Sequence, residues 1–211
     1  MKELLVKQIM QVKDRLLKKT KSRKAIILVF FLLFSNSAIG EEGLSENIIR
    51  YLNSIENFSA SFLQSDDQTI EEGKLFIGKT RARVEYDNPS KIVLVLAEKK
   101  AMYYNYDLDE VEFFNPRNTS AWFFYEIFKN PLSLKGSEIK IENSFIEVLK
   151  TGNHQDQNYK LKIIFENNPL LIRKIYLEFE DIKITVSMYD HKMGESFSRH
   201  FFKLIPPKTV N

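Results

Sequence analysis

The sequence predicts a mainly β protein of the α+β class, in which one strongly curved antiparallel sheet, a barrel or half-barrel, carries short helices on its concave side. Two observations predict this fold. Residues 73–124 read as consecutive short segments of alternating apolar and polar side chains, and residues 138–204 repeat the pattern. Only residues 44–55 and 119–128 show helical spacing. About ten or eleven strands with two or three short helices predict this architecture.

The first 40 residues have the features of a cleaved secretory signal peptide. Five basic residues between positions 18 and 24 precede an uninterrupted apolar run at 25–34, and Ala38 and Gly40 follow at a spacing that a signal peptidase accepts. Ten apolar residues are too few to span a bilayer, which takes about 20 in a helix; a membrane anchor is the alternative. We therefore expect residues 1–40 to direct export of the chain and residues 41–211 to form a single domain.

The composition of residues 41–211 excludes several classes of protein. Nine of the 31 basic and two of the 28 acidic residues lie before residue 41, which leaves 22 and 26, a net charge of −4. This balance implies no basic surface, so nucleic acid is not expected as a partner. The chain has no cysteine, so disulfides and thiolate metal sites are excluded.

The first elements follow from periodicity. Residues 44–55 place apolar side chains on one side at helical spacing, and Ser45 lies close to a plausible N-cap. Residues 57–64 then alternate as a strand does. Residues 68–77 make the next strand, with Gly73 as a possible bulge.

The middle of the chain continues with strands and one helix. Residues 92–96 are apolar on both faces, which predicts a central strand covered on both sides. Residues 119–128 break the strand pattern and form a helix that Thr119 can cap, and this helix must be covered on several sides because it is apolar almost all round. Further strands are predicted at 82–86, 102–106, 111–114, 138–141, 144–150, 159–166, 170–179, 182–189 and 197–204.

Motifs for catalysis and for metal binding were sought in the sequence. It contains no G-x-S-x-G, P-loop or H-E-x-x-H pattern. His154, His191 and His200 stand far apart without metal-ligand spacing. We therefore expect no catalytic residue, metal or cofactor, and a protein that is not an enzyme.

Six segments stand in an order that resembles the periplasmic lipoprotein-carrier family, LolA. The resemblance covers residues 46–208, nearly all of the chain after the signal peptide. The segments are Phe58-Ser-Ala-Ser-Phe-Leu-Gln64, Glu72-Gly-Lys-Leu-Phe-Ile77, Arg83-Val-Glu-Tyr-Asp-Asn-Pro89, Tyr104-Asn-Tyr-Asp-Leu-Asp-Glu-Val111, Thr119-Ser-Ala-Trp-Phe123 and Phe202-Lys-Leu-Ile-Pro-Pro207.

The resemblance implies an unclosed β-barrel with a helical lid, whose apolar interior holds the acyl chains of lipoproteins. The implied partners are acylated lipoproteins, an inner-membrane transporter that releases them and an outer-membrane acceptor; we expect a monomer. In the family an Arg after the third strand holds the lid shut, and here Lys79 is the best stand-in, with Arg81 and Arg83 as alternatives. The predicted cavity and lid residues, for which a filled sheet core is the alternative, are Ala82, Val84, Tyr86, Leu94, Met102, Tyr104, Trp122, Phe123, Phe124 and Phe128.

The sequence leaves three other functions open. An outer-membrane acceptor of the same pathway shares the fold, although such a protein is usually lipid-anchored through a cysteine. An envelope-stress sensor can use a similar half-barrel to detect mislocalised lipoproteins. A lipid hydrolase would need a nucleophile–base pair, and we find none in the sequence.

Overall fold

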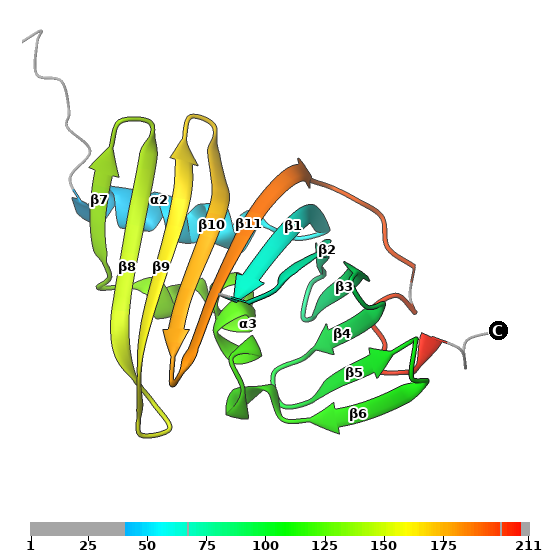
Figure 1. The fold of residues 1–211 in the computed structure, drawn as a ribbon. Helices are drawn as coiled ribbons and strands as arrows, with labels where there is room; N and C mark the ends of the chain where they lie inside the picture. The colour runs from blue at the N-terminus through cyan, green and yellow to red at the C-terminus, as the bar shows by residue number, and fades with distance from the viewer. Residues whose placement is uncertain (1–40, 67, 199, 208–211) are drawn as a thin grey trace, which may run out of the picture. The chain divides into compact units, whose positions relative to one another are not determined.

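The computed structural model describes residues 41–66, 68–198 and 200–207, and the signal-peptide prediction lies outside them. From Glu41 on the chain is one compact unit. It is built on an 11-stranded antiparallel sheet that does not close, with the order β6-β5-β4-β3-β2-β1-β11-β10-β9-β8-β7 (Figure 1). The predicted fold class is confirmed. The strands are β1 (Phe58–Asp66), β2 (Ile70–Ile77), β3 (Ala82–Asn88), β4 (Ile92–Leu96), β5 (Ala101–Asn105), β6 (Glu110–Phe114), β7 (Glu138–Glu142), β8 (Phe145–His154), β9 (Gln157–Asn167), β10 (Leu170–Phe179) and β11 (Ile182–Lys192).

Two α-helices lie within the described residues, α2 (Glu41–Ser54) and α3 (Ala121–Lys129). Short 3-10 turns, η1 (Pro116–Asn118) and η2 (Pro131–Leu134), flank α3. Figure 1 shows α3 inside the bend of the sheet and α2 crossing β8, β9 and β10. The apolar sides of both helices share one buried cluster with the sheet, so both helices cover its concave face.

Both helix starts differ from the prediction. Because α2 already begins at Glu41, Ser45 lies within the helix rather than at its N-cap. The hydroxyl of Thr119 donates to the carbonyl oxygen of Pro116 at 3.0 Å, so it does not cap α3. Ser120 stands at the N-cap position of α3 and makes no side-chain cap hydrogen bond.

Strand register decides which side chains reach the concave face, because directly opposed residues of antiparallel strands point to the same side. Leu75 of β2 pairs with Val84 of β3, which pairs with Leu94 of β4. All three contribute to the large cluster under the helices. The β2–β3 register does shift between Glu72 and Gly73, but the residue left without a partner is Asp87 of β3, so the irregularity lies opposite Gly73 rather than at it.

A second, smaller cluster lies on the outer face of β4 and β5. It consists of Val93, Val95, Met102 and Tyr104, with Leu204 of the C-terminal segment packed against it. Since Leu94 and Leu96 pack into the concave cluster, β4 is covered on both faces, as the sequence predicted.

The strand predicted at 197–204 is wrong. The described part of this segment forms turns instead, and its carbonyl oxygens accept hydrogen bonds from arginine side chains rather than from a neighbouring strand. Arg81 Nη1 donates to Phe202 O at 2.8 Å, and Arg83 Nη1 donates to Phe201 O at 2.9 Å. The rings of Phe197 and Phe201 pack edge-on against Phe76 of β2, which holds the segment on the outside of the sheet.

Candidate functional site

An apolar cavity of about 50 Å³ lies beneath α3. Side chains from β1, β2, β3, β4 and β11 form its floor, and two phenylalanines of α3 form its roof. Its volume is far below the 300–1,000 Å³ of typical small-molecule sites, so the hollow is nearly filled by its own walls. The lining residues are Phe62, Gln64, Leu75, Ala82, Val84, Tyr86, Leu96, Phe124, Phe128, Val186 and Met188.

The walls come from segments that are far apart in the chain but adjacent in the sheet. Phe62 of β1 pairs with Met188 of β11, and Gln64 pairs with Val186, so the central strand pair supplies one wall. On α3, Phe124 and Phe128 are four residues apart and therefore lie on one side of the helix. This spacing turns both rings toward the floor.

One end of the cavity is polar. The Tyr86 hydroxyl donates to Gln64 Oε1 at 3.1 Å, and Gln64 Nε2 donates to Glu71 Oε2 at 2.8 Å. Burial raises the pKa of the Tyr86 phenol and, with the charge of Asp66, raises the pKa of the Glu71 carboxyl. These hydrogen bonds satisfy the polar groups at this end, while the rest of the lining is apolar.

Half of the predicted cavity residues line this hollow. Ala82, Val84 and Tyr86 form part of the floor, and Phe124 and Phe128 form the roof. Leu94 packs against the same concave cluster without lining the cavity itself.

Met102 and Tyr104 do not belong to the site. Met102 pairs with Val95 and Tyr104 pairs with Val93, so both side chains lie on the outer face of the sheet, away from α3. The alternation within 102–106 was interpreted correctly, but the sequence alone did not say which face was concave. On the concave side, it is Tyr103 that stands opposite Leu94.

Trp122 and Phe123 occupy other sides of α3. Trp122 stacks on Tyr125 with ring centroids 5.5 Å apart, and the Arg117 guanidinium lies 5.0 Å from its ring. Phe123 is buried against Tyr159 and Phe179 of the other half of the sheet. The helix is thus covered on several sides, as its all-round apolar surface requires.

Hydrogen bonds attach the C-terminal end of α3 to the turn between β2 and β3. Lys129 Nζ donates to the carbonyl oxygen of Gly78 and lies 3.5 Å from that of Lys79. The Tyr125 hydroxyl approaches Thr80 O at 3.4 Å. Burial lowers the pKa of the Lys129 ammonium to about 8, against the opposing effect of the Glu56 charge.

Further hydrogen bonds hold the segments on either side of α3. Lys150 of β8 donates to the carbonyl oxygen of Ser133 in η2. At the other end, His154 Nε2 and Gln155 Nε2 lie 2.7 Å and 3.1 Å from the carbonyl oxygen of Arg117 in η1. Both histidine and glutamine belong to the β8–β9 hairpin, so α3 is attached to both halves of the sheet.

The predicted latch residues are placed elsewhere. Arg81 and Arg83 bind the C-terminal segment on the outer face. The Lys79 side chain is exposed, and within the described residues it makes no hydrogen bond or ion pair; only its backbone takes part. The donor is on the helix instead, because Lys129 reaches the turn from α3.

The family described as outer membrane lipoprotein carrier protein LolA matches residues 53–205. The chain belongs to the LolA family. This assignment confirms the resemblance seen in the sequence. LolA proteins are periplasmic carriers rather than enzymes.

Solved structures with a similar fold share little sequence with this LolA-family chain. An uncharacterized conserved protein from Thermus thermophilus has 10% identity and a TM-score of 0.49, over 77% of this chain and 93% of that one. The Pseudomonas aeruginosa MucA/MucB complex has 10% identity and a TM-score of 0.44, over 75% of this chain and 59% of that one. LprF from Mycobacterium bovis has 5% identity and a TM-score of 0.37, over 72% of this chain and 94% of that one. A search of curated protein sequences finds no significant match.

Several residues that line the cavity beneath α3 were missed in the sequence analysis. Phe62 and Leu75 lie in strands that were recognised, and their alternation with polar neighbours could have identified them. Val186 and Met188 could not be assigned in this way. They reach the site only because β11 pairs with β1, a contact that no local pattern reveals.

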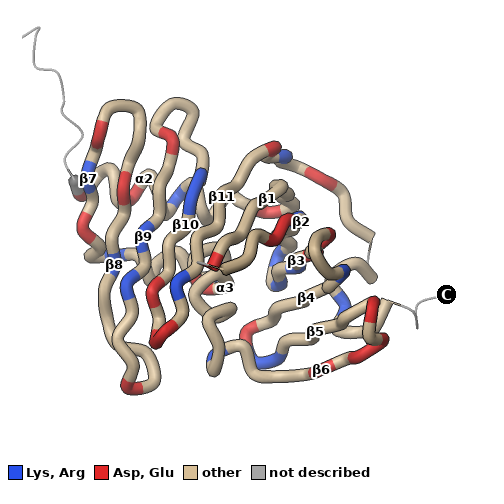
Figure 2. Tube along the Cα trace, viewed as in Figure 1, with Lys and Arg blue, Asp and Glu red and all other residues tan. Residues whose placement is uncertain are grey.

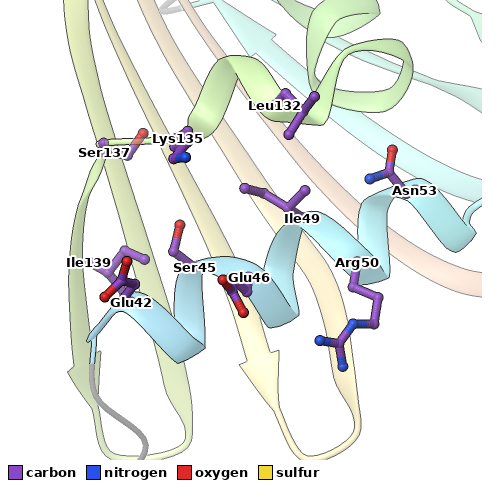
Figure 3. Close-up of a pocket in the computed structure, with 11 residues that line it drawn as sticks. Glu42, Ser45, Glu46, Ile49, Arg50, Asn53, Leu132, Lys135, Ser137 and Ile139 are labelled. Carbon is purple, nitrogen blue, oxygen red and sulfur yellow. The ribbon is translucent and has the colours of Figure 1, made fainter.

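A larger, open groove of about 850 Å³ lies between α2, η2 and β7 (Figure 3). Ile49, Leu132 and Ile139 form its apolar part. Charged side chains, among them Glu46 and Lys135, also line it, as Figure 3 shows. It holds none of the predicted cavity residues, and its mixed lining suits a solvated groove better than a site for hydrocarbon.

Among residues 41–66, 68–198 and 200–207, no group of three or more His, Asp or Glu side chains is arranged to hold a metal ion. Over the same residues, no helix combines the length and apolar character that crossing a membrane requires.

Proposed function

We propose that this protein is a soluble periplasmic carrier, exported by residues 1–40, which takes up the acyl chains of lipoproteins beneath α3. It receives them from an inner-membrane transporter and delivers them to an outer-membrane acceptor. The observation that supports this role is the apolar cavity between the concave sheet and α3, roofed by Phe124 and Phe128. We expect the carrier to be a monomer.

The physical task explains why such a cavity is needed. At about 0.8 kcal/mol for each buried methylene, leaving one chain of about 16 carbons in water costs about 12 kcal/mol. A carrier must therefore remove the chain from water without covalent chemistry. It must also release it, which requires open and closed states that differ by only a few kcal/mol.

The described structure corresponds to the closed, unloaded state in this proposal. A cavity of about 50 Å³ is too small for an acyl chain, so uptake needs α3 to move away from the floor. The contacts from Lys129 and Tyr125 to the β2–β3 turn are few and polar. Lifting α3 also has to separate Phe123 from Tyr159 and Phe179, but none of these contacts is a strand pairing, so the sheet can stay intact.

The experiment that tests the proposal is lipoprotein transfer in vitro. Inner-membrane vesicles that contain an acylated lipoprotein and its releasing transporter are incubated with the purified protein, and the soluble fraction is analysed by mass spectrometry. We expect a soluble complex of the protein with the acylated lipoprotein, which then passes to outer-membrane vesicles. Failure to form that complex would contradict the proposal. A complex that forms but never passes its lipoprotein on would favour a sensor instead.

A further inference from the structure

The edge strand β6 combines a free backbone edge with exposed side chains of two kinds. It stands at one end of the strand order, so no strand among the described residues pairs with its outer edge. Its five residues are Glu110, Val111, Glu112, Phe113 and Phe114, and all but the last are exposed. Figure 2 shows acidic residues gathered on the β5–β6 hairpin.

The register shows which backbone groups of β6 point outward. Tyr106 N donates to Lys91 O, and Ala97 N donates to Lys100 O. These bonds show that the backbone groups of residues 100 and 106, at the two ends of β5, point toward β4. Because bonding direction alternates along an antiparallel strand, residues 101, 103 and 105 bond to β6, where their partners are 114, 112 and 110. The N–H and C=O groups of Val111 and Phe113 therefore face away from the sheet.

The two faces of β6 carry different chemistry. Val111 and Phe113 are 44% and 45% exposed and lie on the outer face, opposite Tyr104 and Met102 of β5. The Lys100 ammonium already lies 4.5 Å from the centre of the Phe113 ring, so this face accepts cations as well as apolar groups.

The glutamates of β6 stand on the concave face, where Glu112 pairs with Tyr103 and Glu110 with Asn105. Within the described residues neither glutamate makes an ion pair or a side-chain hydrogen bond. A strand laid along this edge would thus meet carboxylates on one side and apolar groups on the other.

We propose that β6 is a docking edge to which a partner protein adds an extended segment whose residues alternate between basic and apolar. Backbone hydrogen bonds to Val111 and Phe113 give such strand addition its affinity, and alternate side chains give it specificity. The basic residues of the segment lie beside Glu110 and Glu112, and its apolar residues lie beside Val111 and Phe113. This surface is separate from the cavity beneath α3, so the inference does not depend on acyl binding.

The charge on β6 argues against a second copy of this chain as the partner. Pairing β6 with another β6 brings like-charged glutamates onto one face, which is unfavourable. Pairing it with the other edge strand, β7, also fails. Ile139 and Ile141 of β7 lie on the concave face, opposite Val148 and Ile146 of β8, so a sheet continued through β7 would set isoleucines beside the glutamates.

The test is a titration of the ¹⁵N-labelled protein with a short peptide in which lysine and valine alternate, followed by NMR. We expect chemical-shift changes confined to β6 and its neighbours, together with slower hydrogen exchange at the amides of Val111 and Phe113. A peptide with glutamate in place of lysine serves as the control and should give neither effect. Shifts that are absent from β6, or equal for the two peptides, would overturn the proposal.

Two variants test separately how the charge of β6 and its outward backbone groups contribute to peptide binding. Glu112→Lys should weaken binding of the lysine peptide by about fivefold or more, because like charges then stand side by side. Val111→Pro removes an outward N–H without removing a bond to β5, a position where edge strands tolerate proline, and should also weaken binding. Glu142→Lys on β7 is the matched control and should leave binding unchanged. Undiminished binding by Glu112→Lys would refute a docking edge based on charge.

Discussion

Lys129, at the C-terminal end of α3, donates a hydrogen bond to the backbone carbonyl oxygen of Gly78 in the turn between β2 and β3. Gly78 is buried and Lys129 is half-buried, and this burial lowers the pKa of the Lys129 ammonium to about 8. The bond joins the roof of the cavity to its floor. It is therefore the contact that we expect to control how readily α3 opens.

Replacing Lys129 by methionine removes this donor while keeping a side chain of similar length. The carbonyl oxygen of Gly78 is then left without its partner, which costs about 1–3 kcal/mol in the closed state. We expect α3 to open more often, so a fluorescent fatty acid should bind about fivefold faster or more. Stopped-flow measurement of its association rate checks this.

Lys135→Met is the matched control for this change. Lys135 follows η2, is exposed, and makes no contact with the β2–β3 turn in the described residues. The fluorescent fatty acid should bind to Lys135→Met at the same rate as to the unmodified protein. Equal rates for Lys129→Met and the unmodified protein would show that the Lys129–Gly78 bond does not limit opening.

The lowered pKa of Lys129 makes opening depend on pH. In the closed state the pKa is about 8, and when α3 lifts into water it returns toward the ordinary value of about 10.4. Between these values the closed state binds fewer protons, so raising the pH favours closure; below about 8 both states are protonated and Lys129 adds no dependence. Trp122, the only tryptophan of the chain, lies on α3 and reports the change by fluorescence. A titration in Lys129→Met should lose this transition, and an identical curve in that variant would assign it to another group.

The two aromatic residues Phe124 and Trp122 should differ in their effect on acyl binding. Phe124 lines the cavity, so Phe124→Asp places a carboxylate where we propose that hydrocarbon binds, and it should abolish fatty-acid binding. Trp122 packs against Tyr125 and Arg117 on another side of α3, so Trp122→Asp should reduce binding much less. Titration of both variants with the same fluorescent fatty acid checks this, with circular dichroism to confirm that each sheet is folded. Equal losses would mean that α3 turns a different side toward the ligand.

How far the sequence predicts this molecule depends on how local each feature is. Strands such as β3 and β5 were predicted because alternation is a property of neighbouring residues. Register is not local, and it explains why Met102 and Tyr104 were assigned to the wrong face. The order of strands is also non-local, and it brings Val186 and Met188 to the cavity.

The C-terminal segment shows a different limit. Phe197, Phe201 and Phe202 gave residues 197–204 the aromatic content of a strand. The segment crosses the outer face instead, where Arg81 and Arg83 satisfy its carbonyl oxygens. Long side chains that bind a distant backbone leave no periodic pattern in the sequence. For the same reason, Lys129 was not recognised as a residue that binds α3 to the β2–β3 turn.

Gly73, opposite the register shift in β3, provides a test of how the sheet curves beside the cavity. A Cβ atom at this position would lie 2.1 Å from the backbone oxygen of Glu85 and 2.9 Å from the ring of Phe62. Since the closer neighbour is backbone, Gly73→Ala must shift β3 relative to β2, and we expect a loss of about 2 kcal/mol or more in the free energy of unfolding. Denaturant titration measures it, with Lys74→Ala at the adjacent exposed position as the control expected to change stability by less than about 0.5 kcal/mol. A Gly73→Ala variant as stable as the control would mean that the strands can separate at the bulge without cost, and that the curvature does not depend on this glycine.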